Sequence, residues 1–77
     1  MDAYRLSFNL IVNGIIRATR RAPSAAEMDA ARAIVARAAV DGDATRAAYA
    51  VIVNRGGRHA TRDAVAFHHR LGAGIVA

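Results

Sequence analysis

The chain contains no cysteine, and this absence limits how a protein of 77 residues can hold itself together. Neither a disulfide nor a thiolate metal cage can stabilise its core. A domain of this size buries only about 60–65% of its unfolded surface, so the core is thin. Small domains without such staples depend on dense helix packing or on a partner, and the abundant alanine fits closely packed helices. We therefore expect one domain over residues 1–77, and a homodimer stays open.

Residues 4–21 predict a β-hairpin. From Tyr4 to Val12, apolar residues alternate with polar or neutral ones apart from Ile11, a period of two that is typical of strands. Asn13-Gly14 follows as a strong turn signal, because both residues tolerate positive φ. A helix is the alternative, because the apolar residues between Tyr4 and Ile15 also share one helical face. Gly14 and the β-branched residues around it disfavour that alternative.

The remaining chain predicts three helices, at about 24–41, 44–55 and 60–71. Ser24 and Glu27 have the spacing of a capping box at the start of the first. Gly72 and Gly74 are expected to end the last. The run Val51-Ile52-Val53 leaves a strand open as an alternative for the middle helix. The expected fold class is thus α+β, a hairpin followed by three helices, with an all-α four-helix bundle as the alternative.

Catalytic chemistry finds little support in the sequence. The chain has no cysteine or lysine nucleophile, and both of its serines have structural explanations. His59 and Asp63 are spaced to pair on a helix, but no nucleophile lies near them to be activated. His68 and His69 are adjacent, so their rings point about 100° apart and cannot easily share a metal ion. We expect one of these two histidines to be half-buried and the other to face solvent. No catalytic residue, metal or cofactor is predicted, and the protein is not expected to be an enzyme.

The sequence also predicts a cytoplasmic protein that stays away from membranes. The apolar stretch from Phe8 to Ile16 is interrupted by polar residues and lacks the basic region of a signal peptide. No apolar run approaches the roughly 18 residues that a membrane span needs.

Charge carries most of the functional signal. All 11 lysine-or-arginine positions are arginine, and the net charge is +5. The arginines concentrate at the two ends of the chain, with a mildly acidic stretch between them. A planar guanidinium suits phosphates and carboxylates, so this polarity indicates an anionic partner. The alternative is a solvated face in a genome that disfavours lysine. The residues predicted to bind a partner or nucleic acid are Arg17, Arg20, Arg21, Arg55, Arg58, Arg62, His69 and Arg70.

Two classes of function remain. The first is a small non-catalytic binding protein, typical of phage or mobile-element genes, that acts stoichiometrically on a nucleic-acid-handling complex. An inhibitor of host defence of the anti-CRISPR kind has this character, and its partner would be a protein or nucleoprotein complex with an anionic surface. The alternative is a small regulator that binds DNA or RNA directly. Its reading element would be a helix-turn-helix, formed by helices 43–55 and 60–71, or the β-ribbon at the N-terminus.

Overall fold

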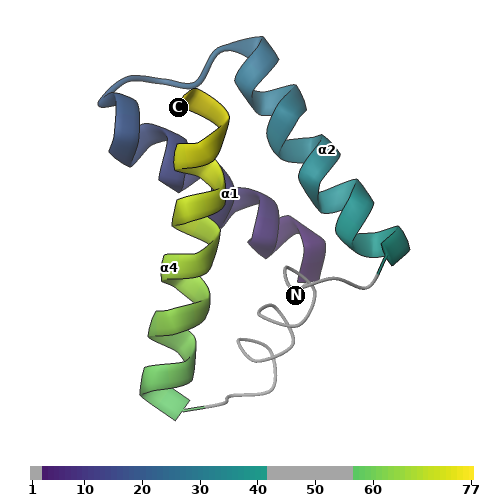
Figure 1. Cartoon of the computed structure of the whole chain (residues 1–77), viewed down its shortest axis with the longest axis vertical. Helices are drawn as coiled ribbons and strands as arrows, with labels where there is room; N and C mark the ends of the chain where they lie inside the picture. The colour runs from purple at the N-terminus through teal and green to yellow at the C-terminus, as the bar shows by residue number, and fades with distance from the viewer. Residues whose placement is uncertain (1–2, 42–56) are drawn as a thin grey trace.

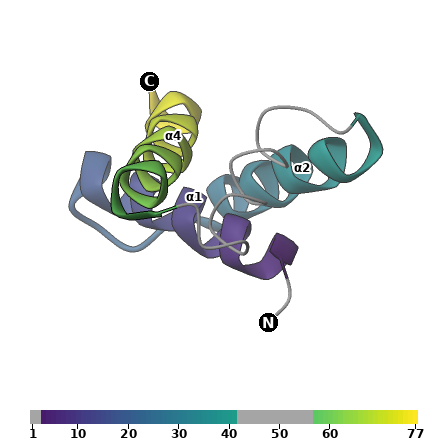
Figure 2. The same cartoon turned by 90° about the horizontal axis from the view of Figure 1, so that it is seen from below.

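The computed structural model describes residues 3–41 and 57–77, and within them every regular element is a helix. The helices are α1 (Ala3–Thr19), α2 (Ala25–Asp41) and α4 (Gly57–Val76). In Figure 1, α4 lies across α1 and α2 lies to one side of that crossing. The view turned by 90° in Figure 2 shows the same arrangement from below. The middle helix predicted at about 44–55, with its alternative strand, lies outside the described residues.

The hairpin predicted at 4–21 is wrong, and with it the α+β fold class. Helix α1 runs through Asn13-Gly14 without a turn. The buried side chains of this segment are Ser7, Ile11 and Ile15, four residues apart, so the period that matters is helical. The strand-like alternation was misleading because many of the same residues also form a stripe on one side of a helix. The all-α alternative is the one that fits the described residues.

Helix α2 begins where its capping box predicted. The Ser24 Oγ accepts a hydrogen bond from the Glu27 backbone N–H at 3.1 Å, and Glu27 Oε1 accepts one from the Ser24 backbone N–H at 2.8 Å. Two N–H groups that no helical carbonyl can reach are therefore satisfied. Ala31 and Ala38, which share one side of this helix, are fully buried.

Helix α4 is longer at both ends than predicted. It starts at Gly57 instead of near residue 60, and it does not end at Gly72 or Gly74. The helix continues because Ile75 and Val76 pack against the core cluster, and that burial offsets the poor helix propensity of the two glycines.

Two glycines set the distance between α1 and α4. A Cβ atom built on Gly14 would meet the His69 backbone, with the Cα atom 2.8 Å away. One built on Gly72 would lie 2.9 Å from the Gly14 Cα and 2.8 Å from the Ile15 backbone nitrogen. Real Cβ contacts are not this short, so the helices approach closely only because both positions lack a side chain. This glycine contact makes the α1–α4 interface the most extensive between the described helices.

The core is small and centres on α1. Ile11 and Ile15 of α1 are fully buried against Ala31 of α2. Partly buried apolar side chains from the three described helices surround this cluster: Phe8, Val12, Ile34, Val35, Leu71, Ile75 and Val76. The glycine contact thus positions α4 so that its last turns close the core.

Candidate anion-binding site

The end of α1 is unusual because its stop residue is an arginine. Arg20 has a φ of 60°, the left-handed conformation in which glycine is strongly preferred. Its backbone N–H donates to the Ile16 carbonyl at 2.7 Å, which closes the last turn of the helix. A non-glycine residue pays roughly 1 kcal/mol for this conformation. The helix therefore ends at some cost in backbone energy. In return, position 20 carries a guanidinium group, which a glycine there would lack.

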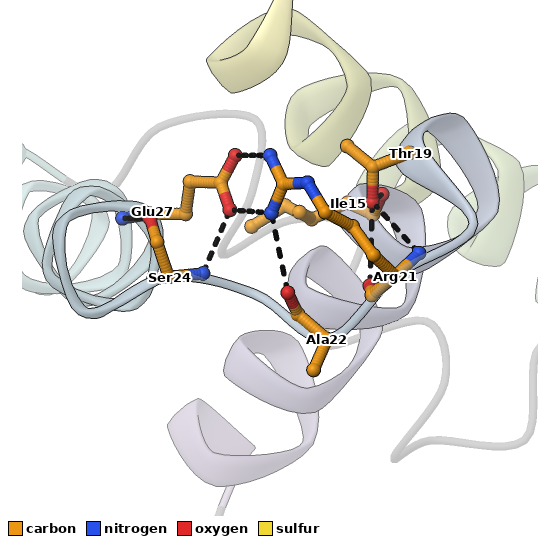
Figure 3. Close-up of polar contacts among 6 residues, drawn as sticks. All are labelled: Ile15, Thr19, Arg21, Ala22, Ser24 and Glu27. Atoms are coloured by element: carbon orange, nitrogen blue, oxygen red, sulfur yellow. Dashed lines mark hydrogen bonds and ion pairs between the residues drawn. The ribbon is translucent and has the colours of Figure 1, made fainter.

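A polar network fixes the connection from α1 to α2, as Figure 3 shows. The Arg21 guanidinium donates to both carboxylate oxygens of Glu27, at 2.7 and 2.8 Å, and to the Ala22 carbonyl at 3.2 Å. The Arg21 backbone N–H donates to Thr19 Oγ1 at 3.3 Å. Because Glu27 also accepts from Ser24, one carboxylate joins the start of α2 to the chain that leaves α1.

The same contacts explain the electrostatics of Glu27. Hydrogen bonds from Arg21 and then from the Ser24 backbone lower the pKa of the Glu27 carboxyl to about 2. The charge of Arg21 is therefore compensated within the fold. Arg32 is compensated as well, because it donates to Asp29 at 2.9 Å and its guanidinium lies 5.4 Å from the centre of the Phe8 ring.

Three other arginines converge on a hollow between the end of α1 and the last part of α4. The hollow has a volume of about 380 Å³. Its described lining residues are Gly14, Arg17, Ala18, Arg20, His69, Arg70 and Ala73. No carboxylate pairs with these three arginines within the described part of the chain, and none of the described lining residues is acidic. Basic residues from the end of α1 and from α4 therefore line one space, and no described carboxylate compensates their charge.

The geometry of this hollow depends on the glycine contact. Gly14 lines it and permits the close approach of the His69 backbone, so Arg17, one turn after Gly14, is brought towards α4. Ala18 and Ala73 contribute only methyl groups, which leave room between the longer side chains.

Partial burial and nearby positive charge both act on the His69 imidazole. Desolvation, the charge of Arg17 and the neighbouring His68 all lower the pKa of the His69 imidazole. A cationic ring is disfavoured where positive charge already gathers, so His69 is neutral near pH 7 and can accept a proton if that charge is offset.

The sequence predicted eight binding residues, and the structure brings four of them together: Arg17, Arg20, His69 and Arg70. Arg21 is not among the described residues of the hollow, and its guanidinium is engaged by Glu27. Arg62 is exposed on α4 two turns before Arg70. Arg58 belongs to the first turn of α4, but its side chain is outside what the structure describes, and Arg55 is outside the described residues altogether. Sequence reasoning assigned Gly14 to a turn and missed its place in the hollow, because its contact with the His69 backbone has no local signal in the sequence.

The two adjacent histidines are both more buried than the half-buried and solvent-facing pair that the sequence predicted. His68 is fully buried, and its Nδ1–H donates to the Ala64 carbonyl at 2.7 Å, whereas His69 is only part-buried. Burial lowers the pKa of the His68 imidazole. Its Nε2 and the buried Ser7 Oγ make no hydrogen bond within the described structure. His68 is thus a neutral core residue rather than part of the hollow.

Comparison with protein-family models, curated proteins and solved structures found no match to this chain. Among the described residues, no three histidine, cysteine or acidic side chains cluster as a metal site would need. The described helices include none that has the length and apolarity to cross a membrane.

Proposed function

We propose that this chain is a non-catalytic binding protein whose basic hollow docks on an anionic surface of a nucleic-acid-handling complex. In this role it acts stoichiometrically, as an inhibitor of the anti-CRISPR kind does, by covering the surface that it binds. The docking residues are those that line the hollow: Arg17 and Arg20 of the α1 end, and His69 and Arg70 of α4.

The observation that carries this proposal is the uncompensated charge in the hollow. Arg21 and Arg32 show that this fold pairs arginines with its own carboxylates where it can. The hollow arginines have no such partner in the described structure, although like charges brought together repel. An arrangement that retains this repulsion is favourable once an anionic group enters, because each guanidinium then forms a charge-assisted hydrogen bond.

A second candidate is a DNA-binding regulator in which α4 is the helix that enters the major groove. It is favoured by the exposed Arg62 and Arg70 on α4, two turns apart along one helix. The first helix of that motif, predicted at 43–55, lies outside the described residues. The β-ribbon version of this candidate is withdrawn, because residues 4–19 belong to α1.

Co-purification with charge-reversed variants tests the proposal. Tagged parent protein is recovered from its native host beside Arg17→Glu, Arg70→Glu and Arg5→Glu, and the recovered protein and nucleic acid are identified. Arg5 is exposed near the start of α1 and is not among the described residues of the hollow, so its reversal is a control of equal charge change. Reversal of Arg17 or Arg70 should reduce recovery of the complex about tenfold or more, while Arg5→Glu should retain most of it.

Each result has a distinct reading. Recovery of a nucleic-acid-handling complex with the parent and its loss with both hollow variants supports the proposal. Recovery of naked duplex DNA, lost when Arg62 rather than Arg17 is reversed, supports the regulator instead. If all three variants recover the same partner as the parent does, the hollow is not the docking surface and the proposal is wrong.

A further inference from the structure

The lining of the hollow points to one kind of anionic group. A carboxylate has two oxygens in one plane, and in this protein a single guanidinium, that of Arg21, already engages both oxygens of Glu27. Three arginines and a histidine, from the end of α1 and from α4, line the hollow. The lone pairs of a carboxylate all lie in its own plane, so donors that approach from two separate elements cannot all meet them well. The oxygens of a phosphodiester are arranged as a tetrahedron, so donors can approach its two charged oxygens from several directions.

The conformation of Arg20 is an independent observation that points to a ligand. Glycine would end α1 in the same left-handed conformation without strain, as it does in many helices. Arginine at this position costs backbone energy and adds a third guanidinium to a space that already repels cations. Strained residues of this kind concentrate at binding sites, where the strain is offset by what the side chain does.

We propose that the α1–α4 hollow is a receptor for one phosphodiester group of a nucleic-acid backbone, bound by Arg17, Arg20 and Arg70 and completed by His69. This inference rests on the proposed function and narrows its anionic surface to the nucleic acid of the complex. None of the described lining residues is Phe, Tyr or Trp, so the described lining supplies charged groups for the backbone and no large aromatic ring for a base. The receptor therefore reads the backbone and tolerates any base sequence.

The affinity of the receptor for a phosphodiester should depend on pH, and the protonation of His69 gives the direction. The charged and titratable groups around His69 are Arg17 and Arg20 from α1, and His68 and Arg70 from α4. A bound phosphodiester offsets the positive charge of these arginines, so the complex favours the protonated ring more than the free protein does. Binding then takes up a proton, and affinity rises as the pH falls from about 8 towards about 6. The phosphodiester itself keeps one negative charge throughout that range.

The test uses a labelled oligothymidylate of about 12 nucleotides and measures its fluorescence anisotropy at several salt concentrations. The parent should bind with a log-linear salt dependence. Arg17→Ala, Arg70→Ala and Arg20→Gly should each weaken binding several-fold and lower the salt slope by about 1. Arg5→Ala, which removes the same charge outside the hollow, should leave the slope close to that of the parent. In His69→Gln, the tightening between about pH 8 and about pH 6 should be lost.

A second arm separates sources of phosphate. Vesicles of phosphatidylglycerol and phosphatidylcholine are tested at matched phosphate concentration, and they should bind more weakly than the oligonucleotide. Vesicle binding without oligonucleotide binding overturns the inference. An equal loss of affinity in Arg5→Ala and in the hollow variants also overturns it, because diffuse charge and not a receptor would then explain binding.

Failure of the inference can be told from failure of the proposed function. If the oligonucleotide does not bind, yet Arg17→Glu and Arg70→Glu still lose the native complex, the hollow binds protein carboxylates and only the phosphate receptor is wrong. If the oligonucleotide binds through the hollow while both reversed variants keep the complex, the receptor stands and the proposed docking is wrong.

Discussion

At the scale of single residues, Arg20 is where stability and binding oppose each other. Arg20→Gly removes the left-handed strain and should raise the melting temperature, whereas Arg20→Ala keeps the strain and loses only the guanidinium. We expect the glycine variant to be more stable than the alanine variant by about 1 kcal/mol. Thermal unfolding of the three proteins measures this difference. Equal melting temperatures for the glycine and alanine variants would show that the backbone at position 20 is not strained.

Ser24 is a second residue whose contribution can be isolated. Its hydroxyl accepts from the Glu27 backbone N–H, and no other described side chain replaces it. Ser24→Ala should lower the free energy of unfolding by about 1 kcal/mol, and Ser24→Asp should retain most of the parent stability because aspartate also caps helices well. Chemical denaturation monitored by circular dichroism provides the comparison. A loss of the same size in both variants would argue against capping as the cause.

At the scale of elements, replacing a helix glycine by alanine should change the stability in opposite directions at different positions. Gly14→Ala and Gly72→Ala each place a methyl group against the backbone of the facing helix, which cannot move aside. Both should destabilise the protein by about 1–3 kcal/mol or more, as overpacking does. At Gly74 a Cβ meets nothing within 4 Å, so Gly74→Ala should instead stabilise α4 by about 0.5–1 kcal/mol. Unfolding midpoints of the three variants test these predictions. If all three midpoints shift in the same direction, helix propensity and not the close approach of α1 and α4 determines the effect of these glycines.

The same elements show what sequence could predict. Helix α2 was placed correctly because its signals are local: Ser24 and Glu27 are three residues apart, and Ala31 and Ala38 repeat at helical spacing. The N-terminal segment failed because Gly14 has two meanings. In a local reading it permits a turn, and in the fold it permits contact with His69 of α4, which no local pattern reveals. Tertiary packing then overrides the strand-like alternation.

The hollow was predictable only in part, for the same reason. Arginine content and its concentration at the chain ends marked Arg17, Arg20 and Arg70 as candidates. Their convergence depends on the crossing of two helices more than 50 positions apart in sequence, and the engagement of Arg21 by Glu27 depends on the course of the connection. Composition therefore predicts that the binding residues are arginines, but only the fold shows which arginines lie close to one another.

At the scale of the whole molecule, acid should destabilise the protein in two separate steps. Burial lowers the pKa of His68 in the folded state, so the unfolded chain binds the proton more readily. The stability contributed by neutral His68 is complete above the ordinary histidine pKa of about 6.5 and is lost as the pH falls below it. Glu27, with a folded pKa of about 2, contributes stability above its ordinary value of 4.5 that is lost as the pH falls towards 2.

Two substitutions separate these steps. His68→Phe keeps a ring of similar shape and cannot titrate, so the decline in melting temperature between about pH 7 and about pH 5 should become shallower. Part of that decline should remain, because His69 titrates in the same direction.

Glu27→Gln should leave the first step unchanged and remove much of the second, because the amide can neither titrate nor form the ion pair with Arg21. Melting curves recorded from about pH 8 to about pH 2 test both variants. If His68→Phe declines as steeply as the parent above about pH 5, the buried imidazole is not what couples this fold to acid, and the remaining histidines must be.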